Sequence, residues 1–326
     1  MKKKALSAFL SLLLLGVTSC TGEKTYSVSD YGKSMAYHDD FTILQWTDIH
    51  LGIESDTSKV QEVLDLELDD IQSKKGRAPE LIVITGDTFL NAEKSTVDWF
   101  FSYLDEKNIP FAFTYGNHDF QGSYSNDYIG KVISEKKNAV FVDYPDDSIS
   151  GWTNYYIDLT EKDSTKYRLF IVDSNSYYQQ GLKIQYDIIH KDQLAHIDDI
   201  VKEKGKVPSL AFYHIPVYEF DDAYKDYQAG KMKGTGTNEE KVAYGYQRTD
   251  AFTRMKEDGV IGMFCGHDHI NNSSLLYQDV LLSYGMKSTY EIYNDEVGYT
   301  LIHLHGQETF ALDDIEKVVV GKGEQE

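Results

Sequence analysis

The sequence predicts an α/β fold in which a parallel sheet with crossover helices packs against a second sheet. From Phe41 onward, short apolar runs alternate with longer polar stretches of helical character, and this strand, helix, strand order produces parallel strands. Near the end of the chain, residues 280–284 and 299–304 instead alternate in the way that is typical of antiparallel strands. The 326 residues are 41% hydrophobic and 26% charged, which is the composition of a folded globular protein.

The individual elements are predicted from the apolar runs and from the polar stretches between them. In addition to the two late strands, strands are expected at residues 41–46, 81–85, 110–115, 167–172, 209–213 and 260–264. Helices are expected at residues 58–75, 94–107, 191–204 and 249–258. No segment repeats with a period of 20–50 residues, which excludes a solenoid.

The amino terminus has the pattern of an export signal. Three lysines precede an apolar run at residues 5–17, which is shorter than the ~20 residues that span a bilayer. The segment Leu15-Gly16-Val17-Thr18-Ser19-Cys20 that follows resembles a bacterial lipobox. We therefore expect a removed signal peptide at residues 1–19, a lipid on Cys20, a tether at 20–40 and a single domain at 41–326 with a short C-terminal tail. The alternative is ordinary signal cleavage beside an incidental cysteine.

This interpretation predicts an extracytoplasmic protein of the bacterial cell envelope, held at the membrane only through the lipid on Cys20. The chain has two cysteines, so a lipidated Cys20 leaves Cys265 without a partner and excludes a disulfide framework. Acidic residues outnumber basic residues 53 to 32, giving a formal net charge of −21 and a pI near 4.8. Such a balance argues against a surface for duplex nucleic acid, which requires a basic patch.

Residue types that bind metals follow five of the predicted strands. In open α/β sheets, ligands bind beyond the carboxyl ends of the strands, so these side chains are expected at one edge of the fold. The residues are Asp48 and His50 after the first strand, Asp87 after the second, Asn117 and His118 after the third, His214 after a later strand, and His267 and His269 after another.

Five short blocks carry these residues, and together they resemble the signature of the calcineurin-like metallophosphoesterases. The blocks are Asp48-Ile49-His50, Gly86-Asp87, Gly116-Asn117-His118-Asp119, Tyr213-His214 and Gly266-His267-Asp268-His269. The resemblance spans roughly residues 41–312. It implies that the domain is catalytic and forms a four-layer α/β/β/α sandwich of two mixed β-sheets flanked by helices.

The ligand types favour two transition-metal ions. Carboxylate, amide and imidazole groups without cysteine suit Mn, Fe or Zn, as divalent ions or as a mixed-valence pair. Seven such groups are too many for one ion, whereas two ions bridged by a carboxylate would use them all. By resemblance, one ion is held by Asp48, His50, Asp87 and His269, and the other by Asp87, Asn117, His214 and His267.

The resemblance implies hydrolysis of a small phosphorylated substrate, with a metal-bridging hydroxide as the nucleophile. The leading hypothesis is phosphomonoester hydrolysis, and the alternative is hydrolysis of nucleotide, lipid-headgroup or glycerol phosphodiesters. A non-catalytic binding scaffold is a third hypothesis. His118 is expected to hydrogen-bond a phosphate oxygen and assist the leaving group, and Asp119 is expected to orient His118. The tyrosine-rich loops at residues 120–154, 174–185 and 216–247 are expected to select the substrate.

One position departs from the purple acid phosphatases within this superfamily. Those enzymes carry an iron-binding tyrosine three residues after the bridging aspartate, where this chain has Leu90. The sequences at residues 46–50, 213–216 and 266–271 look most like those of the purple-acid-phosphatase-related group, which lacks this tyrosine. Purple tyrosinate–iron chemistry is therefore not expected.

Overall fold

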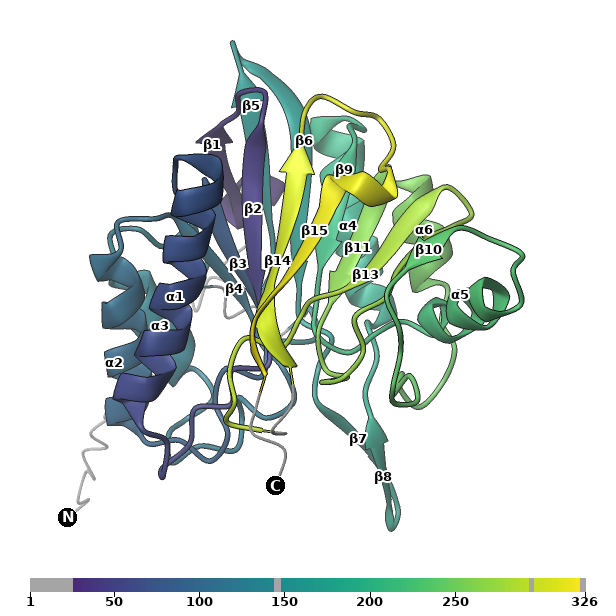
Figure 1. The fold of residues 1–326 in the computed structure, drawn as a ribbon. Coiled ribbons are helices and arrows are strands. Elements are labelled where there is room, and N and C mark those ends of the chain that lie inside the picture. The colour runs from purple at the N-terminus through teal and green to yellow at the C-terminus, as the bar shows by residue number, and fades with distance from the viewer. Residues whose placement is uncertain (1–25, 144–147, 293–295, 323–326) are drawn as a thin grey trace, which may run out of the picture.

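Two β-sheets lie face to face, and helices cover the outer side of each, in the computed structural model of the chain (Figure 1). The structure describes residues 26–143, 148–292 and 296–322. Both sheets contain parallel and antiparallel strand pairs. The expected four-layer α/β/β/α sandwich of two mixed sheets is therefore confirmed.

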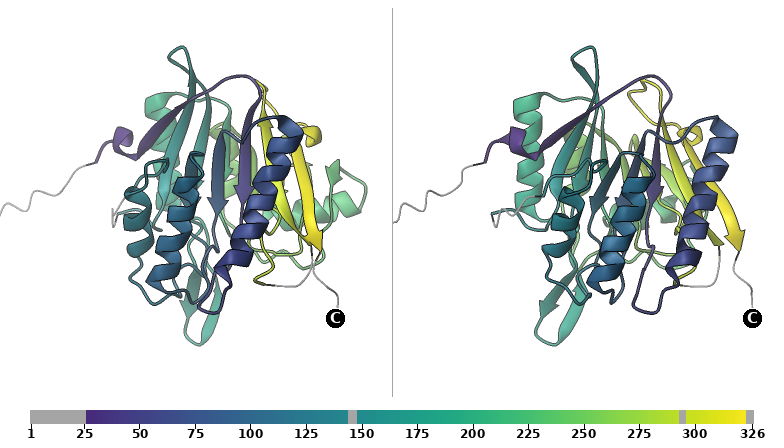
Figure 2. Two further views of the ribbon diagram at one scale, coloured as in Figure 1. Left: turned by 60° about the vertical axis from the view of Figure 1, so that its left-hand side comes forward. Right: turned by 90° about the vertical axis from the view of Figure 1, so that its left-hand side faces the viewer.

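The five-stranded sheet has the strand order β15-β14-β2-β3-β4. Strands β2, β3 and β4 are parallel, and β14 runs antiparallel to both β2 and β15. Helices α1, α2 and α3 lie side by side over the outer face of this sheet (Figure 2). The bounds are β2 Phe41–Trp46, β3 Leu81–Thr85, β4 Phe111–Thr114, β14 Glu296–Leu304, β15 Ile315–Lys322, α1 Thr57–Lys75, α2 Lys94–Glu106 and α3 Tyr128–Ser134.

The eight-stranded sheet has the strand order β1-β5-β6-β9-β11-β13-β12-β10. Its four central strands, β6, β9, β11 and β13, are parallel, and helices α4, α5 and α6 lie on its outer side. The strand bounds are β1 Gly32–Ala36, β5 Asn154–Glu161, β6 Ser164–Val172, β9 Ser209–Phe212, β10 Gly234–Thr235, β11 Val260–Cys265, β12 Ser274–Tyr277 and β13 Val280–Tyr284. The helix bounds are α4 Lys191–Lys204, α5 Glu219–Gln228 and α6 Ala251–Glu257.

A separate two-stranded hairpin, β7 Tyr177–Gln180 and β8 Lys183–Tyr186, extends beyond the edge of the sheets (Figure 1). Two short 3₁₀ helices complete the described elements. They are η1 Val28–Tyr31 and η2 Leu312–Asp314.

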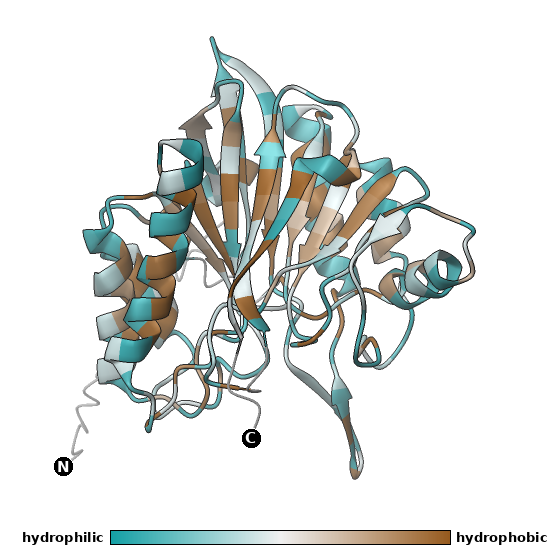
Figure 3. Cartoon of the chain, viewed as in Figure 1, coloured by the Kyte–Doolittle hydropathy of each residue, from teal (hydrophilic) through white to brown (hydrophobic). Residues whose placement is uncertain are grey.

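Burial of apolar side chains explains the layering. Every residue of β2, β3 and β4 is buried, because each strand lies between helices on one face and the other sheet on the opposite face. Figure 3 shows this pattern, with apolar strands inside and helices whose polar faces point outward. Strands covered on both faces read as continuous apolar runs, which is why the sequence identified them.

Helix α1 shows how local signals set an element. Asp56 caps its start by accepting a hydrogen bond from Ser58 N, and Gly76 ends it in a left-handed conformation with φ 74°. The buried side chains are spaced to form one face of the helix, and that face packs on the five-stranded sheet. They are Val60, Leu64, Glu67 and Ile71.

The predicted strands and helices coincide closely with observed ones, but two expectations need correction. The late strands, expected to form a second sheet together, are divided between the two sheets. Residues 280–284 form β13 of the eight-stranded sheet, whereas β14 and β15 extend the five-stranded sheet beside β2. Residues 28–36, expected to be part of the tether at 20–40, form η1 and β1, and β1 pairs with β5. Backbone hydrogen bonds to β5 and the burial of Tyr31 hold this segment against the fold.

The expected signal peptide and Cys20 lie outside the described residues. Within the described part of the chain, no helix is both long and apolar enough to cross a bilayer. The lipid anchor and the location in the cell envelope stay predictions.

Glu67 is the one carboxylate in the buried face of α1, and it gives the stability of the fold a testable pH dependence. Trp46 Nε1 donates to Glu67 Oε2 at 2.6 Å, and the side chain is fully buried. Burial raises the pKa of Glu67 well above its usual value, because a buried charge loses its hydration.

We expect Glu67→Gln to gain stability relative to the wild type as the pH rises above about 4.3, the ordinary pKa of a glutamate. Above that pH the unfolded wild-type chain ionises Glu67 while the folded chain keeps it protonated, so the unfolded state is favoured, and glutamine cannot ionise. Urea unfolding of both proteins between pH 4 and pH 8 measures the difference. Glu62→Gln, an exposed position on the same helix, is the control. A difference that stays constant with pH would contradict the account.

Candidate metal centre

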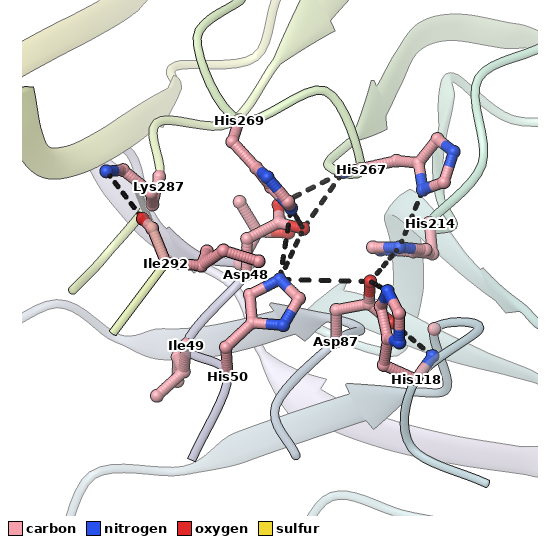
Figure 4. A network of polar contacts seen from close by, with 12 residues as sticks. Asp48, Ile49, His50, Asp87, His118, His214, His267, His269, Lys287 and Ile292 are labelled. Carbon is pink, nitrogen blue, oxygen red and sulfur yellow. Dashed lines mark hydrogen bonds and ion pairs between the residues drawn. The ribbon is translucent and has the colours of Figure 1, made fainter. Parts of the chain in front are cut away.

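The seven predicted metal ligands meet at one edge of the fold, where the carboxyl ends of strands from both sheets come together. Asp48, His50, Asp87 and Asn117 follow strands of the five-stranded sheet. The other ligands follow β9 and β11 of the eight-stranded sheet. Figure 4 shows the carboxylates and imidazoles pointing toward one another, which are those of Asp48, His50, Asp87, His214, His267 and His269.

The first group of ligand atoms comes from Asp48, His50, Asp87 and His269, and its atoms lie within 4.8 Å of one another. His50 Nε2 lies 3.0 Å from His269 Nε2. Asp48 Oδ1 lies 3.7 Å from His50 Nε2 and 3.5 Å from His269 Nε2. Asp87 Oδ2 closes the group at 3.9 Å from His50 Nε2.

The second group contains Asp87, His214 and His267. His214 Nε2 lies 3.0 Å from Asp87 Oδ2 and 3.2 Å from His267 Nδ1. Asn117 lies close to this group because the chain is held there by the next residue. The backbone N–H of His118 donates to Asp87 Oδ1 at 2.7 Å. Both groups contain Asp87, which is the residue that they share.

The geometry of these atoms fits metal ions. Two ligands bound about 2.1 Å from one ion and at right angles lie about 3.0 Å apart, close to the observed separations of the ring nitrogens. Asn117 Oδ1, the oxygen that would bind an ion, is buried and accepts no hydrogen bond from the described residues, as expected of a metal ligand.

Contacts between the two sheets orient the ligands. His214, from the eight-stranded sheet, donates Nδ1–H to Thr85 O of β3 at 2.8 Å, which directs Nε2 into the site. The backbone N–H of His267 donates to the Asp48 carboxylate at 3.0 Å. These two contacts fix the loops after β9 and β11 to the five-stranded sheet.

The backbone at the ligands is strained. Non-glycine residues rarely adopt positive φ, and such residues often occur at functional sites. Four of the seven predicted ligands do so: Asp48 (φ 55°), His50 (φ 55°), Asp87 (φ 50°) and His267 (φ 80°).

The glycines beside the ligands permit close approach of the loops. A Cβ atom on Gly116 would collide with the backbone N and carboxylate of Asp87, and one on Gly266 would collide with Thr47 Oγ1. Gly86 has φ 85°, which a side chain would disfavour. These three glycines support the sequence-based expectation of tight turns that bring ligands together.

Burial and the charges of neighbouring groups shift the pKa values of the candidate ligands. Burial alone would raise the pKa of Asp87, but the charge of His214 lowers it below its usual value. Burial alone would lower the pKa of His214, but Asp87 raises it to about 10. Burial and the neighbouring His214 lower the pKa of His267 to about 3. Without metal, the proton of this group therefore resides on His214, and a cation that binds there must displace it.

His118 lies beside the metal ligands without belonging to either group. Its Nε2 is 4.0 Å from Asp87 Oδ2, and its side chain is 25% exposed, so substrate can reach it. Its Nδ1 lies 2.8 Å from Gln121 Oε1. Because an amide oxygen only accepts, Nδ1 donates to Gln121, and Nε2 is the nitrogen on the side of Asp87.

The predicted role of Asp119 is wrong. Its Oδ1 accepts from Phe89 N at 2.8 Å and its Oδ2 accepts from Gly116 N at 2.7 Å, so the carboxylate ties together the loops after β3 and β4. Gln121 instead hydrogen-bonds the ring of His118, and it was not among the residues predicted from the sequence. The turn after His118, in which Gln121 N donates to His118 O at 2.9 Å, brings the Gln121 side chain back to the ring.

Cys265 and several other histidines lie outside the centre. Cys265 is buried, and burial raises the pKa of its thiol well above its usual value, which describes an inert core cysteine. Several of the remaining histidines pair with carboxylates elsewhere: His38 with Glu80, His190 with Asp187, His303 with Glu316, and His305 with Asp314.

The chain is similar to known proteins over most of its length. The family described as calcineurin-like phosphoesterase matches residues 41–271. Phosphatase DCR2 of Saccharomyces cerevisiae is 28% identical over 305 residues, covering 82% of this chain and 50% of that protein, so the chain spans about half the length of this relative. Probable inactive purple acid phosphatase 14 of Arabidopsis thaliana is 25% identical over 331 residues, covering 89% of this chain and 80% of that protein. These names agree with the expected resemblance to the purple-acid-phosphatase-related group.

A solved crystal structure shares the fold, with a TM-score of 0.50 and 10% sequence identity. The match covers 87% of this chain and 100% of the other. At this level of identity the match shows the fold alone.

Because Asp87 belongs to both ligand groups, we expect Asp87→Asn to weaken metal binding by more than the ~10–100-fold typical of losing an outer contact. The amide keeps the shape of the side chain and removes the negative charge. Equilibrium dialysis against Mn²⁺ and Zn²⁺ measures the loss, with circular dichroism to verify folding. Asp69→Asn, an exposed position on α1, is the matched control. Unchanged affinity and stoichiometry in Asp87→Asn would contradict the shared role of Asp87.

Proposed function

The chain belongs to the calcineurin-like phosphoesterase family, and we propose that it hydrolyses phosphate monoesters with a pair of transition-metal ions. The observation that carries this proposal is the sharing of Asp87 between two groups of converging ligand atoms. One position would use Asp48, His50, Asp87 and His269, and the other Asp87, Asn117, His214 and His267. Mn, Fe or Zn would suit these carboxylate, amide and imidazole ligands.

When bound, the two cations would activate a water as nucleophile and neutralise charge on the phosphoryl group. The chain's own residues hold the reaction in place. The buried ligands are fixed by hydrogen bonds between the two sheets, so little reorganisation is needed when substrate binds. The partial exposure of His118 leaves an open side from which the ester can approach.

We assign His118 the transfer of a proton to the leaving group. The oxygen of a hydroxide forms a bond to phosphorus as the bond from phosphorus to the alcohol oxygen breaks. The doubly protonated ring of His118 gives its Nε2 proton to that alcohol oxygen and is left neutral, with Nδ1–H still on Gln121. The hydrogen bond from Nδ1 to Gln121 Oε1 keeps Nε2 directed at the substrate side of the ring. Gln121 therefore takes the orienting role that the sequence suggested for Asp119.

The names of the plant relatives raise the possibility of a non-catalytic scaffold, since several are called probable inactive phosphatases. A scaffold has no need of buried ligand atoms without hydrogen-bond partners, which cost free energy in a metal-free protein. Asn117 Oδ1 is such an atom, and His118 is present beside the ligand groups. These observations support the enzymatic alternative.

Hydrolysis of nitrophenyl phosphate and of bis-nitrophenyl phosphate tests the proposal. The protein is first treated with a chelator and then supplied with Mn²⁺, Zn²⁺ or Fe²⁺. We expect metal-restored turnover with the monoester favoured. Turnover with the diester favoured would support the phosphodiesterase alternative, and metal binding without turnover of either ester would contradict the proposal.

We expect His118→Ala to lower kcat for an alkyl phosphate monoester by roughly 10²–10⁴-fold, because the leaving alkoxide then lacks a proton donor. Metal content should stay at the wild-type value, since His118 is outside both ligand groups. Steady-state kinetics and metal analysis of the same sample provide both readouts. His38→Ala, whose side chain is 52% exposed, is the control. Wild-type kcat in His118→Ala would exclude this role.

A further inference from the structure

The β7–β8 hairpin contacts the candidate metal centre through its base. Tyr177 and Tyr186 are opposite one another in the strand register, and their rings stack with centroids 5.7 Å apart. The hairpin extends away from the sheets, and Leu182 at its tip is fully exposed. The pair of tyrosines therefore links a protruding element to the edge of the fold where the ligands meet.

Tyr177 touches Asn117 through a hydrogen bond. Asn117 Nδ2 donates to the Tyr177 hydroxyl at 3.0 Å. An amide group has a nitrogen end and an oxygen end, so holding Nδ2 fixes the direction of Oδ1. That oxygen is buried and accepts no hydrogen bond from the described residues, which is the state expected of a ligand atom.

The Tyr177 hydroxyl also reaches the side chain of Gln121, which is the residue that holds Nδ1 of His118. One hydroxyl thus connects a predicted metal ligand with the residue that orients the predicted proton donor. Networks of this kind set the rotamers of the groups that do the chemistry.

Tyr186 supports a second ligand of the same group. Its ring packs edge-on against the imidazole of His267, with centroids 4.3 Å apart and an interplanar angle of 88°. Contact at this distance restricts rotation of the imidazole. Asn117 and His267 belong to the same expected ion position, and the two tyrosines of the hairpin therefore act on one position of the two.

We propose that Tyr177 is a positioning residue for the ion held by Asn117, Asp87, His214 and His267, and that the β7–β8 hairpin is the element that supports this position. The inference rests on the proposed two-metal function. From the sequence, residues 174–185, which include most of this hairpin, were expected only to select the substrate. A change in the hairpin would alter the occupancy of one metal position while the position formed by Asp48, His50 and His269 stays intact.

Binding of Mn²⁺ alone to the full chain tests this inference. We expect Tyr177→Phe to weaken the binding of one ion by about 10–100-fold, the usual cost of removing an outer contact, and to leave the other ion at wild-type affinity. Titration followed by electron paramagnetic resonance provides a second readout, because a spin-coupled Mn²⁺ pair would be replaced by the signal of a single ion at subsaturating metal.

Tyr178→Phe is the matched control. It removes the same hydroxyl from the adjacent position of the hairpin, where the ring stacks on Tyr246 with centroids 3.9 Å apart. Tyr178→Phe should bind both ions as the wild type does. Equal binding by the Tyr177→Phe and Tyr178→Phe proteins would overturn the inference, as would equal weakening of both ions in Tyr177→Phe.

The wild-type titration separates this inference from the proposed function. If the wild type binds fewer than two Mn²⁺ ions, the two-metal function itself fails. If the wild type binds two and Tyr177→Phe also binds two with unchanged affinity, only the role of Tyr177 fails.

Discussion

The docking of the two sheets at the carboxyl ends of their strands is the constraint on which the candidate site depends. Gln45 of β2 donates to Thr85 Oγ1 of β3 at 2.9 Å and to Cys265 O at the end of β11 at 3.0 Å. Just beyond this buried contact, His214 bonds to Thr85 O and His267 bonds to Asp48. Each expected ion position takes ligands from both sheets, so the packing that forms the core also determines the ligand geometry.

The same arrangement concentrates groups that are costly to bury. Two carboxylates, several imidazoles and four residues with positive φ lie within a few ångströms of one another. The apolar strands on either side hold them there, since every residue of β2, β3 and β4 is buried. Opposite charges on Asp87 and His214 offset part of the cost in the absence of metal. The core thus stabilises a site that would be unfavourable by itself.

Much of the fold and the ligand set could be predicted from the sequence, because central parallel strands are continuous apolar runs and the ligands follow them directly. The pairing of β14 with β2 could not, because the partner strand is more than 250 residues away in the chain and either sheet offered an edge. Strand β1 was not predicted, because Gly32–Ala36 contains no apolar run. Its position is fixed instead by backbone hydrogen bonds to β5.

Within the site, the side chains beyond the ligands were the hardest to predict. Asp119 follows His118 directly, yet the turn directs its carboxylate toward backbone N–H groups and brings Gln121 back to the ring. Tyr177 is distant in sequence from Asn117, and only the folded hairpin brings their side chains together. Adjacency in sequence is a poor guide in tight loops, whereas the order of ligands after successive strands is a good one.

The most direct test of the account is a crystal structure of the protein soaked with Mn²⁺, with the ions located by anomalous scattering. The account predicts two peaks, one among Asp48, His50 and His269, the other among Asn117, His214 and His267, and Asp87 between them. A single peak, or none, at a metal concentration that saturates binding in solution would contradict the two-metal centre.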